Sequence, residues 1–205
     1  MKRWLLMGIA FSSLLLSGCA SVIRTDVLAF HEWPADLQNK TYVFDRKAGQ
    51  DNNLEEKSYE NLVRTELTRL GFTEAATPAA ANLKVAMNYQ IDSRDVRTVQ
   101  PYVVDPYWYG PYYGPGWRYG RYYDPFWYPG PVTQYREVQY QLFQRQLNIV
   151  ITNIKSGKKL YDVTVHSSGG NGSLAFAMPY MVRSAFTDFP GKNGVPRRID
   201  LEIKE

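Results

Sequence analysis

Apolar and polar residues alternate in several short segments of the chain, a pattern typical of strands with one buried face. The clearest case is residues 83–91, where apolar side chains stand at every second position. Residues 161–165 and 199–203 repeat the alternation, and residues 27–30 and 41–44 are rich in β-forming types. We predict strands in all five segments, and strands with one polar face are typical of an antiparallel sheet.

A longer strand is predicted for residues 136–154, but its apolar positions change parity. They are even-numbered up to Leu142 and odd-numbered from Leu147 onward. A β-bulge or a change of face near residues 143–145 would reconcile the two halves.

Two segments have the three- and four-residue spacing of amphipathic helices. In residues 59–70 the apolar positions form one stripe, followed by Gly71, which suits a left-handed C-cap, and by Phe72, which can fold back on the last turn. In residues 178–189 the stripe begins near Pro179, which is tolerated in a first turn, and ends at Pro190.

Together these segments predict a single α+β domain over residues 27–205: an antiparallel sheet with two helices packed on one face. A long Pro/Gly/Tyr-rich insert, residues 101–131, separates the two long strands. A connection of this length inside a compact domain is usually functional or disordered.

The insert is strongly aromatic, and we regard its aromatic residues as the candidate contacts for a ligand or partner. Three interpretations are open: a low-complexity loop without a ligand, a recognition surface that stacks on sugars or seats partner side chains, and an interfacial belt at lipid headgroups. The residues are Tyr107, Trp108, Tyr109, Tyr112, Tyr113, Trp117, Tyr119, Tyr122, Tyr123, Phe126, Trp127 and Tyr128.

The N-terminus has the features of an export signal. Lys2 and Arg3 precede an apolar run, residues 4–16, which at about 13 residues is too short to span a bilayer core. Its end, Leu16-Ser17-Gly18-Cys19, resembles the lipobox of bacterial lipoprotein signal peptides. That resemblance implies removal of residues 1–18 and acylation of Cys19, the only cysteine.

The same resemblance predicts where the protein resides. Ala20 rather than Asp follows Cys19, which by the sorting rule of enterobacterial lipoproteins implies the outer membrane. Residues 19–26 would then be a lipidated tether of at most about 25 Å.

Composition narrows the possible functions further. The chain has 24 Lys and Arg against 20 Asp and Glu, a net charge of +4, and loss of Lys2 and Arg3 would lower it to +2. That charge is too small to indicate nucleic-acid binding. With Cys19 lipidated, no intramolecular disulfide can form.

We find no motif of a known catalytic or metal site. His31 has no partner at metal-ligand spacing, and His166 falls on the polar side of its strand. Asp92 and Asp95 near a strand end are typical of a solvated rim. The sequence therefore predicts a protein that is not an enzyme and has no cofactor and no metal.

Six short segments resemble a bacterial lipoprotein family, the domain of unknown function 4136. The resemblance implies an envelope lipoprotein with a small α+β domain and brings no catalytic residue with it. The segments are Thr41-Tyr42-Val43-Phe44, the helix end from Glu66 to Phe72, Asn82-Leu83-Lys84-Val85, Gln146-Leu147-Asn148-Ile149, Gly157-Lys158-Lys159-Leu160-Tyr161 and Phe189-Pro190.

The expected function is that of an outer-membrane lipoprotein facing the periplasm, a non-enzymatic binding or accessory module of the cell envelope. Its partners would be the membrane, through the lipid anchor, and an envelope protein. One alternative is a glycan or peptidoglycan binder that uses the aromatic insert, and another is an enzyme of unknown type.

Overall fold

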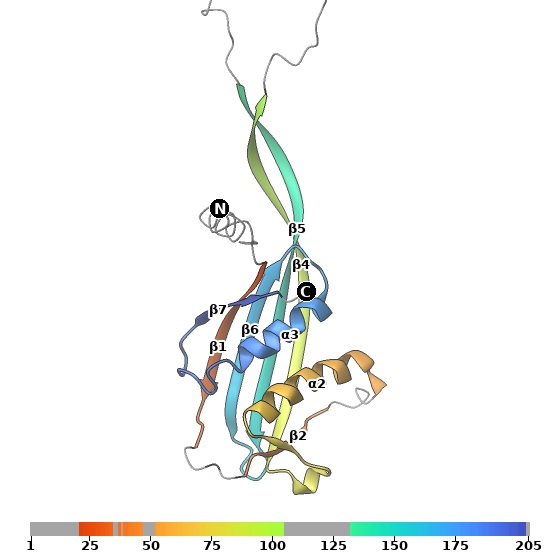
Figure 1. The fold of residues 1–205 in the computed structure, drawn as a ribbon, viewed down its shortest axis with the longest axis vertical. Coiled ribbons are helices and arrows are strands. Elements are labelled where there is room, and N and C mark those ends of the chain that lie inside the picture. Colours follow the sequence, from red (N-terminus) through yellow and green to blue (C-terminus); the bar gives the residue numbers. More distant parts are fainter. Residues whose placement is uncertain (1–20, 35–36, 38, 47–51, 105–131, 204–205) are drawn as a thin grey trace, which may run out of the picture. The chain divides into compact units, whose positions relative to one another are not determined.

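The computed structural model describes residues 21–34, 37, 39–46, 52–104 and 132–203 (Figure 1). The chain divides into two compact units, residues 1–93 with 143–205 and residues 94–142, which are treated separately below. Cys19 and all twelve aromatic residues proposed as contacts lie outside the described residues.

The described strands form one seven-stranded sheet with the order β3-β2-β4-β5-β6-β1-β7. Among the described residues, two α-helices and a short 3-10 helix accompany it. The strands are β1 (Val22–His31), β2 (Thr41–Phe44), β3 (Thr73–Glu74), β4 (Leu83–Val104), β5 (Val132–Asn153), β6 (Lys159–Gly169) and β7 (Arg197–Glu202); the helices are α2 (Leu54–Arg69), η2 (Pro78–Ala80) and α3 (Leu174–Ala185).

The sheet is mixed, so the predicted purely antiparallel sheet is wrong. β6 pairs antiparallel with β5 and β1, and β1 antiparallel with β7, but β2 pairs parallel with both β3 and β4. The cause is the connection that contains α2, because a helix between two neighbouring strands returns the chain to its starting edge and makes the strands parallel. The architecture remains of the α+β class.

Both helices lie against the same face of the sheet (Figure 1). The odd-numbered residues of β1, of β5 from Arg145 to Ile151 and of β6 from Tyr161 to Ser167 point toward them, and most of these form the core together with one face of each helix. Leu147, Ile149 and Ile151 of β5 and Val163 and Val165 of β6 have no exposed surface. The even-numbered residues form the uncovered face of the sheet.

Both ends of α2 are capped, and the C-terminal signal predicted at Gly71 and Phe72 is confirmed. The Asn53 side chain caps the helix by accepting hydrogen bonds from the N–H groups of Glu55 (3.0 Å) and Glu56 (3.4 Å). Gly71 has φ of 82°, and the N–H of Phe72 donates to the carbonyl of Leu67 at 3.0 Å. This bond closes the helix in the manner of a Schellman motif.

Two details differ from expectation. Residues 22–26, which we predicted to be part of the tether, form the first half of β1, because β7 offers them a pairing edge from Val22 opposite Glu202 onward. The predicted bulge near residues 143–145 is absent from the β5–β6 pairing, which is regular from Phe143 to Ile151 and shifts only at Ile151/Thr152.

The second unit explains why the change from even-numbered to odd-numbered apolar positions in β5 led to the wrong prediction of a bulge or a change of face. Residues 132–142 of β5 belong to this unit, in which Tyr135 and Tyr140 are exposed and so do not mark a buried face. Inside the unit the hydroxyl of Tyr102 donates to Oε1 of Gln134 at 2.7 Å, and the guanidinium of Arg136 lies 5.8 Å from the Tyr102 ring. Residues 101–104 of the predicted insert continue β4.

Two buried tyrosines should respond in opposite directions to the same change. Tyr161 donates its hydroxyl to the carbonyl of Ala185 at 2.7 Å, whereas the fully buried Tyr42 hydroxyl has no partner among the described residues. Burial also raises the pKa of Tyr42 to about 12. Tyr161→Phe should lower the free energy of unfolding by about 1 kcal/mol, and Tyr42→Phe should raise it by a similar amount.

Urea unfolding of the two variants beside the wild-type protein measures this contrast. A loss of stability in both variants would mean that the Tyr42 hydroxyl is satisfied.

Candidate functional site

The uncovered face of the sheet carries a row of polar side chains across neighbouring strands. Strand register places Arg198 opposite Asp26, Asp26 opposite His166, and His166 opposite Gln146. Gln90 of β4 extends the row, because its amide nitrogen lies 3.5 Å from Oε1 of Gln146. The even-numbered positions thus form a continuous hydrogen-bonding surface.

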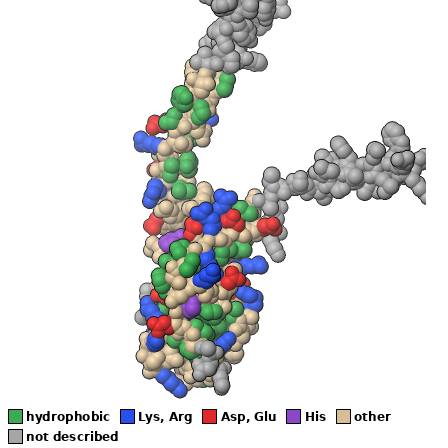
Figure 2. All heavy atoms as spheres, turned by 90° about the vertical axis from the view of Figure 1, so that its left-hand side faces the viewer, with side chains coloured by type: hydrophobic (Ala, Val, Ile, Leu, Met, Phe, Trp, Pro, Cys, Tyr) green, Lys and Arg blue, Asp and Glu red, His purple; other side chains and the backbone are tan. Residues whose placement is uncertain are grey.

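Most charges on this face are already paired with each other. Arg198 Nε lies 3.1 Å from Asp26 Oδ1, and Arg24 Nε lies 3.5 Å from Asp200 Oδ2. These side chains are largely exposed, so each pair contributes about 1 kcal/mol or less. Figure 2, which views the molecule from the side of β7 and β1, shows basic and acidic side chains next to one another along this edge.

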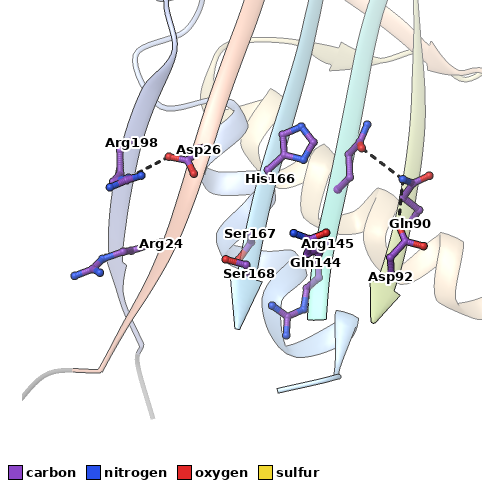
Figure 3. A pocket seen from close by; sticks show the side chains of 11 residues that line it. Arg24, Asp26, Gln90, Asp92, Gln144, Arg145, His166, Ser167, Ser168 and Arg198 are labelled. Atoms are coloured by element: carbon purple, nitrogen blue, oxygen red, sulfur yellow. Dashed lines mark hydrogen bonds and ion pairs between the residues drawn. The ribbon is translucent and has the colours of Figure 1, made fainter. Parts of the chain in front are cut away.

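A groove of about 610 Å³ runs along this surface and is lined by residues of β1, β4, β5, β6 and β7. Figure 3 shows its side chains, with the Arg198–Asp26 pair at one side and Gln90 at the other. The Gln90 amide also lies 3.5 Å from Asp92 Oδ2. The groove therefore offers amides, hydroxyls and guanidinium groups, which are suited to binding.

Arg145 is the one charged residue among those lining the groove that is buried. It occupies an odd-numbered position of β5, in series with the core residues Leu147, Ile149 and Ile151, and only 4% of its surface is exposed. Its Nε is buried and has no hydrogen-bond partner among the described residues. Burial lowers the pKa of the Arg145 guanidinium, but an arginine side chain stays protonated in proteins.

Arg145 stands in a buried polar row on the covered face of the sheet. Register places it opposite Ser167 of β6, and Ser167 opposite Thr25 of β1. Thr25 Oγ1 lies 2.8 Å from Oγ of Ser184 on α3, so these two hydroxyls form a hydrogen bond with each other and not with Arg145. The arginine at the end of the row remains unpaired within the described part of the chain.

A buried charge elsewhere in the protein shows the usual arrangement. Glu60 of α2 is 2% exposed and accepts two hydrogen bonds from Arg46, at 2.7 Å from Nε and 2.6 Å from Nη2. Paired charges of this kind are tolerated inside proteins, whereas an unpaired one is costly. The isolated guanidinium of Arg145 is therefore the most informative feature of the groove.

The residues that the sequence singled out are not brought together in one site. His166 lies in the groove and is exposed, whereas His31 ties β1 to the loop after α3: its N–H donates to Asn193 Oδ1 at 3.0 Å, and its Nε2 lies 3.2 Å from the carbonyl oxygen of Gly191. Asp92 lines the groove near Gln90, and Asp95 belongs to the second unit. Over the described ranges no three His, Cys, Asp or Glu side chains are grouped to hold a metal ion.

Sequence reasoning missed Arg145, although a signal was present. A charged residue at position 145 continues the odd-numbered apolar series of residues 147, 149 and 151. The predicted β-bulge or change of face near residues 143–145 left the side of the sheet on which Arg145 lies undecided. The regular β5–β6 register keeps it on the covered side.

Among the described residues no helix is long and apolar enough to cross a membrane.

Comparison with known proteins identifies a family but no characterised relative. A family model described as "Domain of unknown function (DUF4136)" matches residues 27–191. None of the curated proteins matches the chain. A crystal structure of a PDZ domain protein from Parabacteroides distasonis ATCC 8503 is similar with a TM-score of 0.49 and 14% identity, covering 94% of this chain and 41% of that one. The chain therefore spans less than half of that protein.

Replacing Arg145 by an apolar residue of similar length should stabilise the ligand-free protein. Arg145→Met removes an unpaired buried charge, and we expect the free energy of unfolding to rise by about 1–3 kcal/mol. Arg69→Met is the matched control, because Arg69 is exposed on α2 and pairs with Glu66, and it should change stability by about 0.5 kcal/mol or less.

Denaturant unfolding in a buffer free of phosphate and sulfate measures both variants. A loss of stability in Arg145→Met would show that the guanidinium is satisfied in the free protein.

Proposed function

The chain belongs to the family of the domain of unknown function DUF4136, and we propose that it is an outer-membrane lipoprotein whose domain faces the periplasm. In this proposal the domain is a non-enzymatic binding module of the cell envelope. The observation that carries the proposal is the segment Leu16-Ser17-Gly18-Cys19 behind a short apolar run.

The start of β1 adds to this argument. Val22 is the first residue of the strand and follows Cys19 by three positions, so fully extended backbone separates them by about 10 Å. An acylated Cys19 would thus hold the sheet directly at the lipid surface. Acyl chains contribute about 0.8 kcal/mol per buried CH₂, and three chains make such an anchor effectively permanent.

The chemistry of the groove supports binding rather than catalysis. Its walls provide hydrogen-bond donors and paired charges, and Arg145 provides a cation that has no partner among the described residues. The aromatic insert supports the same role, because Tyr and Trp give large contact areas at low entropic cost. Its composition equally favours the second candidate, a glycan binder, since aromatic rings stack on sugars.

Lipidation is tested by two substitutions at neighbouring positions. Cys19→Ser should move the protein from the membrane to the soluble periplasmic fraction and abolish labelling by radioactive palmitate, because no thiol remains to be acylated. Ala20→Asp, the matched control, should remain lipidated but fractionate with the inner membrane. Unchanged membrane association and mobility of Cys19→Ser would rule out the lipoprotein function.

The aromatic insert is tested by deleting residues 107–128. Crosslinked envelope partners captured by the full chain should be lost from the deletion variant, because the main aromatic contact area is gone. Retention of the full chain, but not of the variant, on isolated peptidoglycan sacculi would favour the glycan binder. Identical capture by both proteins would exclude the insert as the contact surface.

A further inference from the structure

A second groove of about 460 Å³ adjoins the first at the end of the sheet where β1 begins and β6 ends. Both grooves share Arg24, Arg145, Ser167 and Ser168 in their walls. Arg145 therefore lies where the two grooves meet. Its buried Nε has no partner on any described residue, which is the arrangement expected when a ligand supplies the missing acceptor.

Groups around Arg145 provide further donors for an anion. Ser167 lies opposite it in register on the same face of the sheet, and residues 169–171 bring a glycine-rich loop to the edge of the groove. Nη1 of Arg145 lies 3.8 Å from the position that a Cβ on Gly169 would occupy, an ordinary van der Waals distance, so the backbone of the loop lies next to the guanidinium.

The loop leads into the N-terminus of α3, which reinforces the positive potential. Ser173 caps this helix by accepting from the N–H of Phe176 at 3.2 Å, and Phe176 itself lines the groove. The N-terminal turn of a helix carries partial positive charge and favours anions. Here it adds to a buried cation and is not the only feature of the site.

Acidic groups near the site are engaged elsewhere. Asp26 pairs with Arg198, Asp92 lies beside the Gln90 amide, and Asp200 lies 3.5 Å from Arg24. None of the three interactions involves Arg145. The acids lower the general positive potential of the grooves but leave the guanidinium available.

The other wall of the second groove is apolar. It is formed by Val22, Ile23, Phe176 and Ile203, and Val22 and Phe176 are 41% and 39% exposed. An anion bound at Arg145 would therefore have a hydrophobic surface within the same groove. This combination suits an amphipathic ligand with a charged head and an apolar body.

We propose that Arg145, Ser167 and the loop of residues 169–171 bind a phosphate group attached to an apolar body. Phosphate fits better than carboxylate because it presents more oxygens than a carboxylate has, and these can accept from the guanidinium, the Ser167 hydroxyl and backbone amides of the loop. The source is a phospholipid headgroup or a soluble phosphate ester. The lipid source rests on the proposed lipidation of Cys19, which would place Val22 and this groove at the membrane.

Calorimetric titration of the full chain carrying Cys19→Ser, in an uncharged detergent, tests the site without depending on the anchor. The probes are hexyl phosphate, inorganic phosphate and hexanol. Hexyl phosphate should bind about tenfold more tightly than inorganic phosphate, because the hexyl group covers the apolar wall, and hexanol should not bind.

Arg145→Met, introduced into the Cys19→Ser protein, should weaken hexyl phosphate binding about tenfold or more. The hydrogen-bonded charge pair between the guanidinium and the phosphate is then lost. Arg145→Lys keeps the charge but not the bidentate geometry, so it should bind with intermediate affinity and serves if the methionine variant does not fold. Arg69→Met removes a distant exposed arginine and should bind as the parent does. Equal binding by the parent and both Arg145 variants, or by hexanol and hexyl phosphate, would overturn the proposal.

Sedimentation with vesicles then separates the two sources. Binding to phosphatidylcholine vesicles that contain phosphatidic acid, lost in Arg145→Met, supports a lipid headgroup. Binding of hexyl phosphate without vesicle binding supports a soluble phosphate ester. The anchor itself is judged only by the Cys19→Ser fractionation, so failure of one proposal does not imply failure of the other.

Discussion

The burial of one face of β1, β5 and β6 beneath α2 and α3 is the interaction on which the rest of the structure depends. From Ile23 to Ala29 of β1, Arg145 to Ile151 of β5 and Tyr161 to Ser167 of β6 the register is continuous, so the odd-numbered residues are directed to the helices and the even-numbered residues to the opposite face. Removing Leu147, Ile149, Val163 and Val165 completely from water supplies the hydrophobic stabilisation. The same alternation creates the polar row of Asp26, His166 and Gln146 on the uncovered face.

Arg145 acquires its significance from that register. A one-residue slip of β5 would turn the guanidinium into solvent, where it would need no partner. In the observed register it lies on the covered face opposite Ser167. The next hydroxyl of this row, on Thr25, forms a hydrogen bond with Ser184 and so leaves Arg145 without a partner among the described residues. Evolved proteins keep unsatisfied buried groups chiefly where function requires them. The stability lost in the free protein and the anion site proposed at Arg145 are thus two consequences of one position.

The proposed anchor and the proposed anion site converge on the beginning of β1. Val22 pairs with β7, lines the second groove and follows Cys19 by three residues. A lipid on Cys19 would restrict the groove to the region of the headgroups, and a phosphate bound at Arg145 would add a second attachment. Because the anchor would hold the groove among the headgroups, even a weak phosphate site at Arg145 would meet its ligand at high effective concentration.

The sequence by itself determined where most of the strands and the two α-helices of the described residues lie, how α2 ends at Gly71 and Phe72, and that Leu16-Ser17-Gly18-Cys19 resembles a lipobox, because these depend on local spacing and local backbone chemistry. Only the tertiary structure decided that β2 runs parallel to β4, that residues 22–26 belong to β1, and that Arg145 is buried without a partner among the described residues. Strand direction depends on where α2 packs, and the environment of a side chain depends on pairing between distant strands. Neither is encoded in the periodicity of a single segment.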